Sequence, residues 1–394
     1  MSFLDNELRA TLARLELDGL RRSLRVIASE HGPRVTYGGR SLIMLSSNNY
    51  LGLAAHPALK RAAINAMERY GVGAGASRLV AGSLEPIHRL EENLAAFKQV
   101  EAALVFGSGY LASLGALTAL AGPGDVIFSD ELNHASLIDG CRLTRAEIRV
   151  YRHCDSDHLR SLLEQPRPAG RRLIVTDSIF SMDGDFAPLH QIVAVAREFE
   201  AAIVLDEAHA VGVIGPGGAG LAAEFGVEKE IDVHLGTLSK ALGAYGAYIA
   251  GSQVLIDFLI NRSRSFIYTT GLPPAIAAAA DAALEVTRAE PERIKRLWDN
   301  ASYLRDRLTA AGFGFGPTRS PILPLIIGEA QAAVAMAQRL FERGVYVIAI
   351  RPPTVPPGTA RLRITPIADH SRGDLDAAIA AMVQSGRELR LIPS

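Results

Sequence analysis

Residues 201–206 read AAIVLD, a short apolar run with branched side chains that ends on an acid. Runs of the same kind recur along the chain, with helix-patterned stretches between them: ALVF, DVIFS, EIRVY, RLIVTD, DVHLG and AYIAG. Each run has the length of a strand, and the helical stretches are typical of βαβ crossovers. The sequence therefore predicts an α/β fold with a mostly parallel sheet between two layers of helices.

Two further parts flank this predicted sheet. Residues 4–30 repeat leucine along one helical face and then turn basic, which predicts an amphipathic lead-in helix. Beyond about residue 290 the runs PLIIG, VYVIAI and RLRIT alternate with helical patterns and the proline-rich turn PPTVPPG. We therefore expect an N-terminal lead-in segment at 1–50, a large domain at 51–275 and a smaller C-terminal α/β domain at 276–394.

The composition argues against several classes of protein. Hydrophobic residues make up 48% and charged residues 21% of the chain, and the formal net charge is −1. With charges scattered in this way, neither nucleic acid nor a membrane is an expected partner. The start MSFLDNEL is too acidic for a signal peptide, so we expect a cytoplasmic protein. Cys141 and Cys154 lack CxxC spacing and are expected to be small, half-buried apolar residues.

Polar residues follow several of the predicted strands, where open parallel sheets bind their ligands. Asp206 ends AAIVLD, His209 follows three residues later, and Lys240 comes shortly after DVHLG. An acid at the end of a buried strand can keep a heterocyclic nitrogen protonated. A desolvated lysine can form a Schiff base with an aldehyde. Together they indicate pyridoxal phosphate, whose ring acts as an electron sink.

A phosphate anchor is expected after the strand ALVF. Residues 106–113, FGSGYLAS, predict a glycine turn that opens a helix, so backbone N–H groups and the helix dipole can face an anion. Ser108 adds a hydroxyl there, and Thr237 and the stretch YTTG offer others. His134 could stack its ring on a planar cofactor, and Ser181 could reach the phenolic edge of the cofactor.

Each of these residues has a plainer interpretation when taken alone. A lone lysine in a turn is usually a solvated charge, and an acid at a strand end is often a helix or turn cap. A single histidine in a loop is more often a turn residue than a stacking platform. What favours the cofactor site is the joint arrangement of phosphate turn, histidine, Asp-x-x-His and lysine at the ends of consecutive strands.

Other motifs suggest other functions. DEAH also occurs in nucleic-acid helicases, but an NTPase needs GxxxxGK[ST], and no lysine here follows a glycine. GPGGAG at 215–220 fits a dinucleotide fingerprint, yet it lacks the acid expected about 20 residues further on. HCDSDH at 153–158 collects metal-type side chains, although a polar strand-to-helix loop explains it more simply. A catalytically inactive scaffold on the same fold would not need Lys240 or Asp206.

The motifs resemble the α-oxoamine synthases, which are pyridoxal phosphate enzymes of the aminotransferase-like fold type I. The resemblance runs along nearly the whole chain, from SSNNYLGL through HAS, SMDGD, DEAH and TLSK to PPTVPPGTARLR. It implies that Lys240 forms the Schiff base, that Asp206 pairs with the pyridine nitrogen and His209 with the phenolic oxygen, and that His134 stacks on the ring. In DEAH, Glu207 replaces the aspartate of several relatives and is expected to point away from the ring.

The same resemblance implies the remaining contacts. It assigns the cofactor phosphate to Ser108, Gly109, Tyr110 and Thr237. Thr270 would reach across from the partner subunit of a homodimer, so that the two subunits share each site. Arg363 would hold the amino-acid carboxylate, Asn48 would lie near the acyl substrate, and Arg21 and Arg351 would lie near the acyl chain.

The reaction of this family joins an amino acid to an acyl thioester and releases CO2 and the free thiol. The stretch AIRPPTVPPGTARLR is most similar to the branch that uses L-alanine with pimeloyl-CoA or with the pimeloyl thioester of an acyl carrier protein. Sister enzymes use the same core motifs with glycine or serine and with acetyl, succinyl or long-chain acyl thioesters. Glycine with acetyl-CoA is therefore the main alternative substrate pair.

Overall fold

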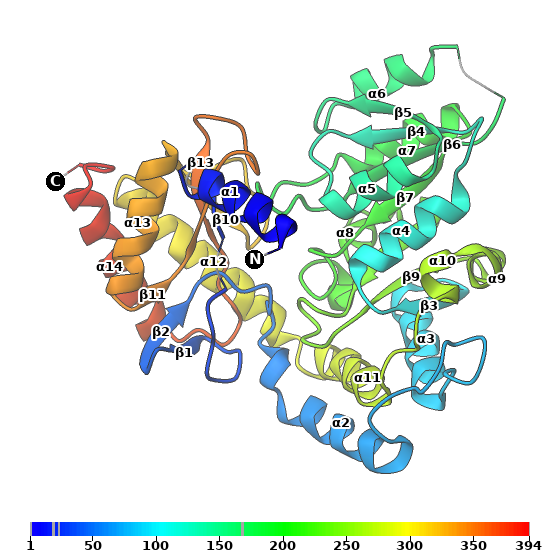
Figure 1. Cartoon of the computed structure of the whole chain (residues 1–394), viewed down its shortest axis with the longest axis horizontal. Helices are drawn as coiled ribbons and strands as arrows, with labels where there is room; N and C mark the ends of the chain where they lie inside the picture. The colour runs from blue at the N-terminus through cyan, green and yellow to red at the C-terminus, as the bar shows by residue number, and fades with distance from the viewer. Residues whose placement is uncertain (1, 18–19, 23, 167–168, 394) are drawn as a thin grey trace.

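A seven-stranded sheet forms the centre of the computed structural model, which describes residues 2–17, 20–22, 24–166 and 169–393 (Figure 1). The strands lie in the order β3-β9-β8-β7-β6-β4-β5. Their bounds are β3 (Ala102–Phe106), β4 (Val126–Asp130), β5 (Glu147–Tyr151), β6 (Arg172–Asp177), β7 (Ala202–Asp206), β8 (Val233–Thr237) and β9 (Ala247–Gly251). The predicted α/β class is confirmed.

One strand of this sheet runs against the others. Strands β4 to β8 pair in parallel, whereas β9 is antiparallel to both β3 and β8. The chain returns from β8 to β9 through residues 238–246, fewer than the dozen or so that a parallel crossover needs. The sheet is therefore mostly parallel, as expected, with its one reversal where the connection is short.

Helices cover both faces of the sheet. Side chains alternate along each strand, so Ile203 and Leu205 of β7 join one apolar cluster while Val204 joins the cluster on the opposite face. The first face is covered by α2 (Pro57–Tyr70), α3 (Glu85–Lys98), α6 (Ser156–Leu163), α7 (Leu189–Glu198), α8 (Leu221–Glu224) and α11 (Pro274–Ala289). The second face is covered by α4 (Gly109–Leu120), α5 (Ala135–Leu143), α9 (Gln253–Arg262) and α10 (Arg264–Ile267).

Two three-stranded sheets form a second part of the molecule, and the first of them joins segments that are far apart in the sequence. One has the order β1-β2-β11 and the other β10-β13-β12. Their elements are β1 (Arg34–Tyr37), β2 (Arg40–Met44), β10 (Leu323–Gly328), β11 (Val345–Tyr346), β12 (Ile348–Ile350), β13 (Ala360–Ile364), α12 (Glu292–Ala310), α13 (Ala330–Glu342) and α14 (Arg372–Glu388). Short 3-10 turns complete the chain at η1 (Leu53–Ala55), η2 (Pro216–Gly218) and η3 (Glu228–Glu230). The domain boundaries at 50 and 275 remain predictions.

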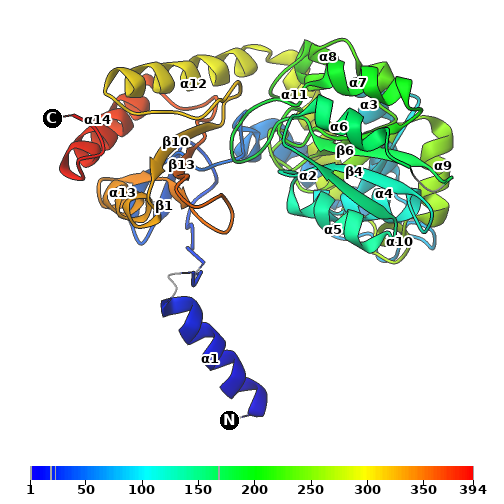
Figure 2. The same cartoon turned by 90° about the horizontal axis from the view of Figure 1, so that it is seen from above.

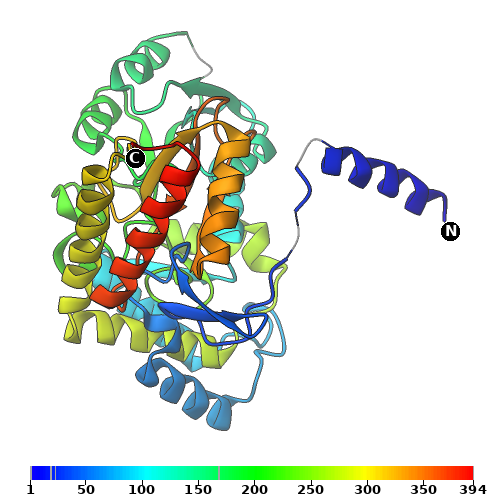
Figure 3. The same ribbon diagram turned by 90° about the vertical axis from the view of Figure 1, so that its left-hand side faces the viewer.

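The lead-in helix is α1 (Phe3–Leu17), and it stands away from the rest of the molecule in two views (Figures 2 and 3). Its apolar face carries Leu4, Leu8 and Leu12, each more than two fifths exposed. Across the described part of the chain, no helix has both the length and the apolar character that a membrane crossing requires.

Candidate active site

A cavity of about 180 Å³ lies at the carboxyl ends of the central strands. The sequence-predicted residues that line it are Gly109, Tyr110, His134, Asp206, His209, Thr237 and Lys240. Sequence reasoning missed four further lining residues, Ser136, Asp177, Ala208 and Ser239. A wider groove of about 780 Å³ lies at the opposite edge, against the first residues of β7 and β8. Because parallel sheets bind ligands at their carboxyl ends, the smaller cavity is the candidate site.

The acid and the amine of the site lie on neighbouring strands. Asp206 ends β7 and is 5% exposed, and its Oδ1 accepts the N–H of Ala208 at 2.8 Å. Burial raises the pKa of Asp206, while the charge of Lys240 opposes the rise. Burial lowers the pKa of Lys240, with Arg363 adding to the effect against the attraction of Asp206 and Asp177. Lys240 is therefore placed to give up a proton and act as a nucleophile.

His209 contacts a buried tyrosine. Its Nδ1 lies 2.8 Å from the hydroxyl of Tyr50, and both side chains are buried. Burial holds the pKa of His209 well below its usual range, with Lys240 and Arg363 contributing, and burial raises the pKa of Tyr50. The Tyr50 hydroxyl can donate to Nδ1 at 2.8 Å or to Asn48 Oδ1 at 3.4 Å, and when it donates to Nδ1 the proton of neutral His209 is on Nε2. His209 can then donate one hydrogen bond into the cavity.

His134 is fixed by the end of the neighbouring strand. It begins α5 as the N-cap, and its Nδ1 lies 2.8 Å from the hydroxyl of Ser136. Its backbone N–H donates to Asp177 Oδ2 at 2.6 Å, and Asn133 donates to the carbonyl of Val175 at 2.8 Å. Burial lowers the pKa of His134. These contacts tie the loop after β4 to β6 and hold the imidazole at the cavity wall.

The start of α4 gives the cavity wall a site that suits an anion. The first residues of α4, Gly109 and Tyr110, line it, and the backbone N–H groups of a helix start attract negative charge. Thr237 Oγ1 and Ser239 Oγ lie 2.8 Å apart and add two hydroxyls. Ser108 is the N-cap, and its Oγ accepts the N–H of Leu111 at 3.2 Å, which leaves its hydroxyl proton available. The acid Asp206, the amine of Lys240 and the flat ring of His134 line the same cavity. Together with the anion site, these residues fit pyridoxal phosphate.

Arg363 of β13 brings the second part of the molecule to the site. Its Nε donates to the carbonyl oxygen of Ser181 at 2.5 Å, and its Nη1 donates to Asn48 Oδ1 at 3.2 Å. Its Nη2 lies 3.5 Å from the Tyr50 hydroxyl, the same group that contacts His209. The predicted residues Asn48, Ser181 and Arg363 therefore form one cluster beside the cavity, although Ser181 contributes its backbone here.

Besides Ser108, Asn48, Ser181 and Arg363, three more predicted residues lie outside the cavity lining. Thr270 is exposed and bridges to Ser77, beside a separate small cavity that Gly107 also lines. Arg21 is exposed between α1 and β1 and pairs with Glu16 at 3.1 Å. Arg351 directly follows β12, before the proline-rich turn. Within one chain, the structure does not bring these residues to Lys240.

Glu207 points away from the cavity, as expected. Its Oε2 lies 2.5 Å from Lys98 Nζ and 2.9 Å from His234 Nδ1. Burial opposes its charge, but Lys98 and His234 outweigh burial and lower the pKa of Glu207 to about 2. Gly220, the last glycine of GPGGAG, packs against Glu207, because a Cβ at this position would meet Glu207 Oε1 at 2.3 Å. Close packing therefore accounts for a glycine that the dinucleotide fingerprint would assign to a ligand.

Comparison with known proteins agrees with this geometry. The family model for aminotransferase class I and II matches residues 40–382. An 8-amino-7-oxononanoate synthase of Geobacter sulfurreducens is 52% identical over 97% of this chain and 98% of that protein. Another, from Anaeromyxobacter dehalogenans, is 52% identical over 95% of this chain and 94% of that protein. The chain belongs to the α-oxoamine synthases of this family.

This α-oxoamine synthase is also similar to solved structures in its fold. A serine palmitoyltransferase from S. paucimobilis, solved with bound PLP and myriocin, superposes with a TM-score of 0.93. The two proteins share 32% sequence identity over 100% of both chains. The predicted aminotransferase-like fold type I is confirmed, together with membership of the α-oxoamine synthases.

Proposed function

We propose that this α-oxoamine synthase condenses L-alanine with pimeloyl-CoA, or with the pimeloyl thioester of a carrier protein. The products are 8-amino-7-oxononanoate, CO2 and the free thiol, which is a step of biotin synthesis. The observation that carries the proposal is the 52% identity to an 8-amino-7-oxononanoate synthase over nearly the full length of both proteins. The shared cavity of Asp206, His209 and Lys240 supplies groups suited to this chemistry.

The proposal includes pyridoxal phosphate as cofactor, because its ring takes up the electrons released at the α-carbon of the amino acid. Asp206 would keep the ring nitrogen protonated through a charge-assisted hydrogen bond. His209 would donate from Nε2 to the phenolic oxygen, and His134 would cover one face of the ring. The start of α4, with Thr237 and Ser239, would hold the phosphate.

Two side chains of this protein would act on the amino acid itself. Arg363 has Nη1 and Nη2 directed toward Asn48 and Tyr50, so its guanidinium can offer a two-pronged contact to the carboxylate. Lys240 would carry the proton taken from the α-carbon, since its lowered pKa suits it to act as a base near neutral pH. The proton returns from Lys240 to the product before release.

A homodimer with shared sites is part of the proposal. Near Thr270, which bridges to Ser77, the surface carries the apolar side chains Leu79, Val80 and Tyr268, each more than half exposed. An exposed apolar patch of this kind is typical of a protein–protein interface. A partner subunit seated there would bring its own Thr270 toward the start of α4.

A substrate panel tests the proposed function. The purified protein, loaded with pyridoxal phosphate, is incubated with alanine, glycine or serine and with pimeloyl, acetyl, succinyl or palmitoyl thioesters. Release of the free thiol is followed, and the product is identified by mass. We expect alanine with the pimeloyl thioester to give the highest kcat/KM. A much faster reaction of glycine with acetyl-CoA would assign the chain to the alternative substrate pair instead.

A further inference from the structure

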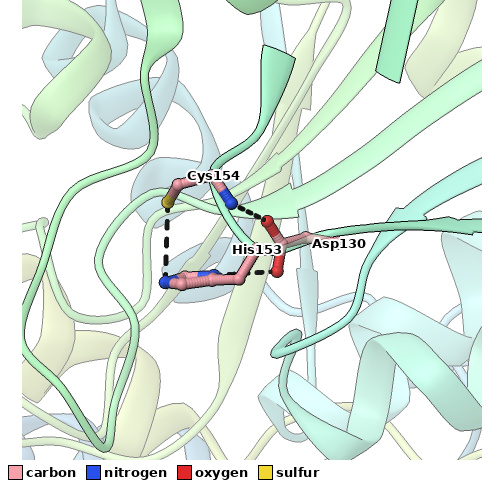
Figure 4. Close-up of side chains that lie close together, drawn as sticks. All are labelled: Asp130, His153 and Cys154. Carbon is pink, nitrogen blue, oxygen red and sulfur yellow. Dashed lines mark hydrogen bonds and ion pairs between the residues drawn. The ribbon is translucent and has the colours of Figure 1, made fainter. Parts of the chain in front are cut away.

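His153 joins two carboxylates, one at the end of β4 and one in the loop that follows β6. It lies in the loop after β5, with Nδ1 at 3.0 Å from Asp130 Oδ1 and Nε2 at 2.8 Å from Asp185 Oδ2. Figure 4 shows Asp130 at the Nδ1 side of the ring and the Cys154 thiol at the other side, where Sγ lies 3.6 Å from Nε2. The backbone N–H of Cys154 donates to the second oxygen of Asp130 at 2.9 Å.

This geometry requires both ring nitrogens to donate. A neutral imidazole has one N–H, whereas two carboxylates facing two nitrogens need two donors, so His153 is an imidazolium. Burial opposes the charge, but the hydrogen bonds to Asp130 and Asp185 outweigh it and raise the pKa of His153 to about 12. Asp130, His153 and Cys154 also form a group of metal-ligand type. A cation on either nitrogen would displace one of the two carboxylate contacts, so we interpret the ring as a bridge.

One end of this bridge lies in the loop that contacts Arg363. The 178–187 loop connects β6 to α7 and carries Asp185 as well as Ser181, whose carbonyl accepts from Arg363 Nε. In the same loop, Asp183 forms an ion pair with Arg361, and Arg361 and Arg363 both lie on β13. The His153 ring also packs edge-on against Phe180, with centroids 4.3 Å apart.

We propose that His153 is a positioning residue for the binding site of the amino-acid carboxylate. By bridging Asp130 of β4 to Asp185, it fixes the 178–187 loop so that the Ser181 carbonyl orients the Arg363 guanidinium. With Nε held in this way, and with Nη1 and Nη2 each donating one N–H to Asn48 or Tyr50, the second N–H of each Nη can face a carboxylate as part of a rigid fork. The inference rests on the proposed function in one respect, the assignment of the carboxylate to Arg363.

The first test replaces His153 by glutamine. The amide of His153→Gln can donate to one carboxylate, but its oxygen then faces the other, so one end of the bridge is lost. We expect the Kd for L-alanine, measured from the absorbance change of the cofactor-loaded protein, to increase roughly tenfold. The KM for the acyl thioester, which does not contact Arg363 in this scheme, is expected to change less than about twofold.

A second measurement needs neither cofactor nor turnover. Hydrogen exchange followed by mass spectrometry reports the protection of the 178–187 loop directly. In His153→Gln this peptide is expected to exchange faster, while the β7 peptide at 202–206 keeps its protection. The matched control is His88→Gln on α3, a partly exposed histidine whose Nε2 lies 2.8 Å from the Ser83 hydroxyl. That variant is expected to match the wild type in both measurements.

A double variant tests the bridge itself. In His153→Gln with Asp185→Asn, the glutamine amide donates to Asp130 and the asparagine amide donates to the glutamine oxygen, which restores a connected chain of hydrogen bonds. Loop protection and alanine affinity are expected to recover toward the wild-type values. Should His153→Gln fail to accumulate, Asp185→Ala removes the half-buried end of the bridge and supplies the same comparison.

Several results would overturn the proposal. Unchanged exchange of the 178–187 loop in His153→Gln would remove the positioning role, and so would faster exchange with unchanged alanine affinity. Stoichiometric Zn²⁺ binding that is lost in Cys154→Ser would replace the bridge by a metal site. If no substrate pair turns over, the proposed function fails, while the exchange data still decide whether His153 fixes the loop.

Discussion

Asp177 and Asp206 lie directly opposite each other on the parallel strands β6 and β7, each as the last residue of its strand. Both are buried, and both line the same cavity as Lys240. Burial raises the pKa of each carboxyl. Their contacts differ, because Asp206 accepts the N–H of Ala208 and Asp177 accepts the backbone N–H of His134; we propose that Asp206 alone pairs with the ring nitrogen of the cofactor.

Asp177→Ala should destabilise the protein and disturb the site together. It removes the acceptor of the His134 N–H, and an unsatisfied buried donor costs about 1–3 kcal/mol. Urea unfolding is expected to show a loss of that size, and the visible circular dichroism of the bound cofactor should decrease as His134 loses its fixed position. Asp177→Asn keeps an acceptor oxygen and should behave more like the wild type. Equal losses in both variants would mean that charge, and not this hydrogen bond, is what matters.

Lys240→Ala should abolish thiol release while the protein still holds cofactor through its phosphate. Borohydride treatment followed by peptide mapping is expected to fix a label at position 240 in the wild type and none in the variant. Lys229→Ala, which removes an exposed lysine on η3, is the matched control and should keep full activity. Measurable turnover by Lys240→Ala would refute the assignment.

Asp206→Asn should bind cofactor but fail to activate the amino acid. Without the carboxylate the ring nitrogen loses its proton, so the α-carbon becomes a weaker acid. Exchange of the alanine α-proton in D2O, followed by NMR without any thioester, is expected to slow by more than about 100-fold. Because the side chains have similar shapes, the cofactor affinity should change little. Wild-type exchange rates would exclude the proposed role of Asp206.

His153 should make the stability fall as the pH rises above neutrality. Its folded-state pKa, near 12, lies above its ordinary value of 6.5, so the folded protein keeps a proton that the unfolded chain loses between these values. The free energy of unfolding should therefore be largest below pH 6.5 and decrease above it, by up to about 1.4 kcal/mol per pH unit. Urea unfolding at several pH values tests this, with His153→Gln as reference. Parallel curves for the two proteins would contradict the prediction.

The apolar patch near Thr270 predicts a dimer that a single charge can break. Val80→Asp places an uncompensated carboxylate on this patch, and analytical ultracentrifugation is expected to show the monomer mass and low activity. Thr270→Ala should remain dimeric but bind cofactor more weakly. If Val80→Asp stays dimeric and fully active, the subunits meet through another surface.

The sequence predicts those site residues that directly follow the carboxyl end of a strand. Asp206 and Lys240 could be predicted to lie together because carboxyl ends of parallel strands meet at one edge. Asp177 carried the same signal, an acid that ends RLIVTD, and was overlooked. Tyr50 could not be found in this way, since its contact with His209 joins segments far apart in the chain. The run VYVIAI looked like one strand, yet Val347 divides it between two sheets.

The pairing of β2 with β11 has a consequence for biosynthesis. Ile43 lies opposite Val345, so β2, which pairs at once with β1, finds its second neighbour only when most of the polypeptide has left the ribosome. Every strand of the seven-stranded sheet has been made by residue 251, well before that neighbour emerges. Late closure of such distant contacts is expected to be the slow phase of refolding and the stage most exposed to aggregation.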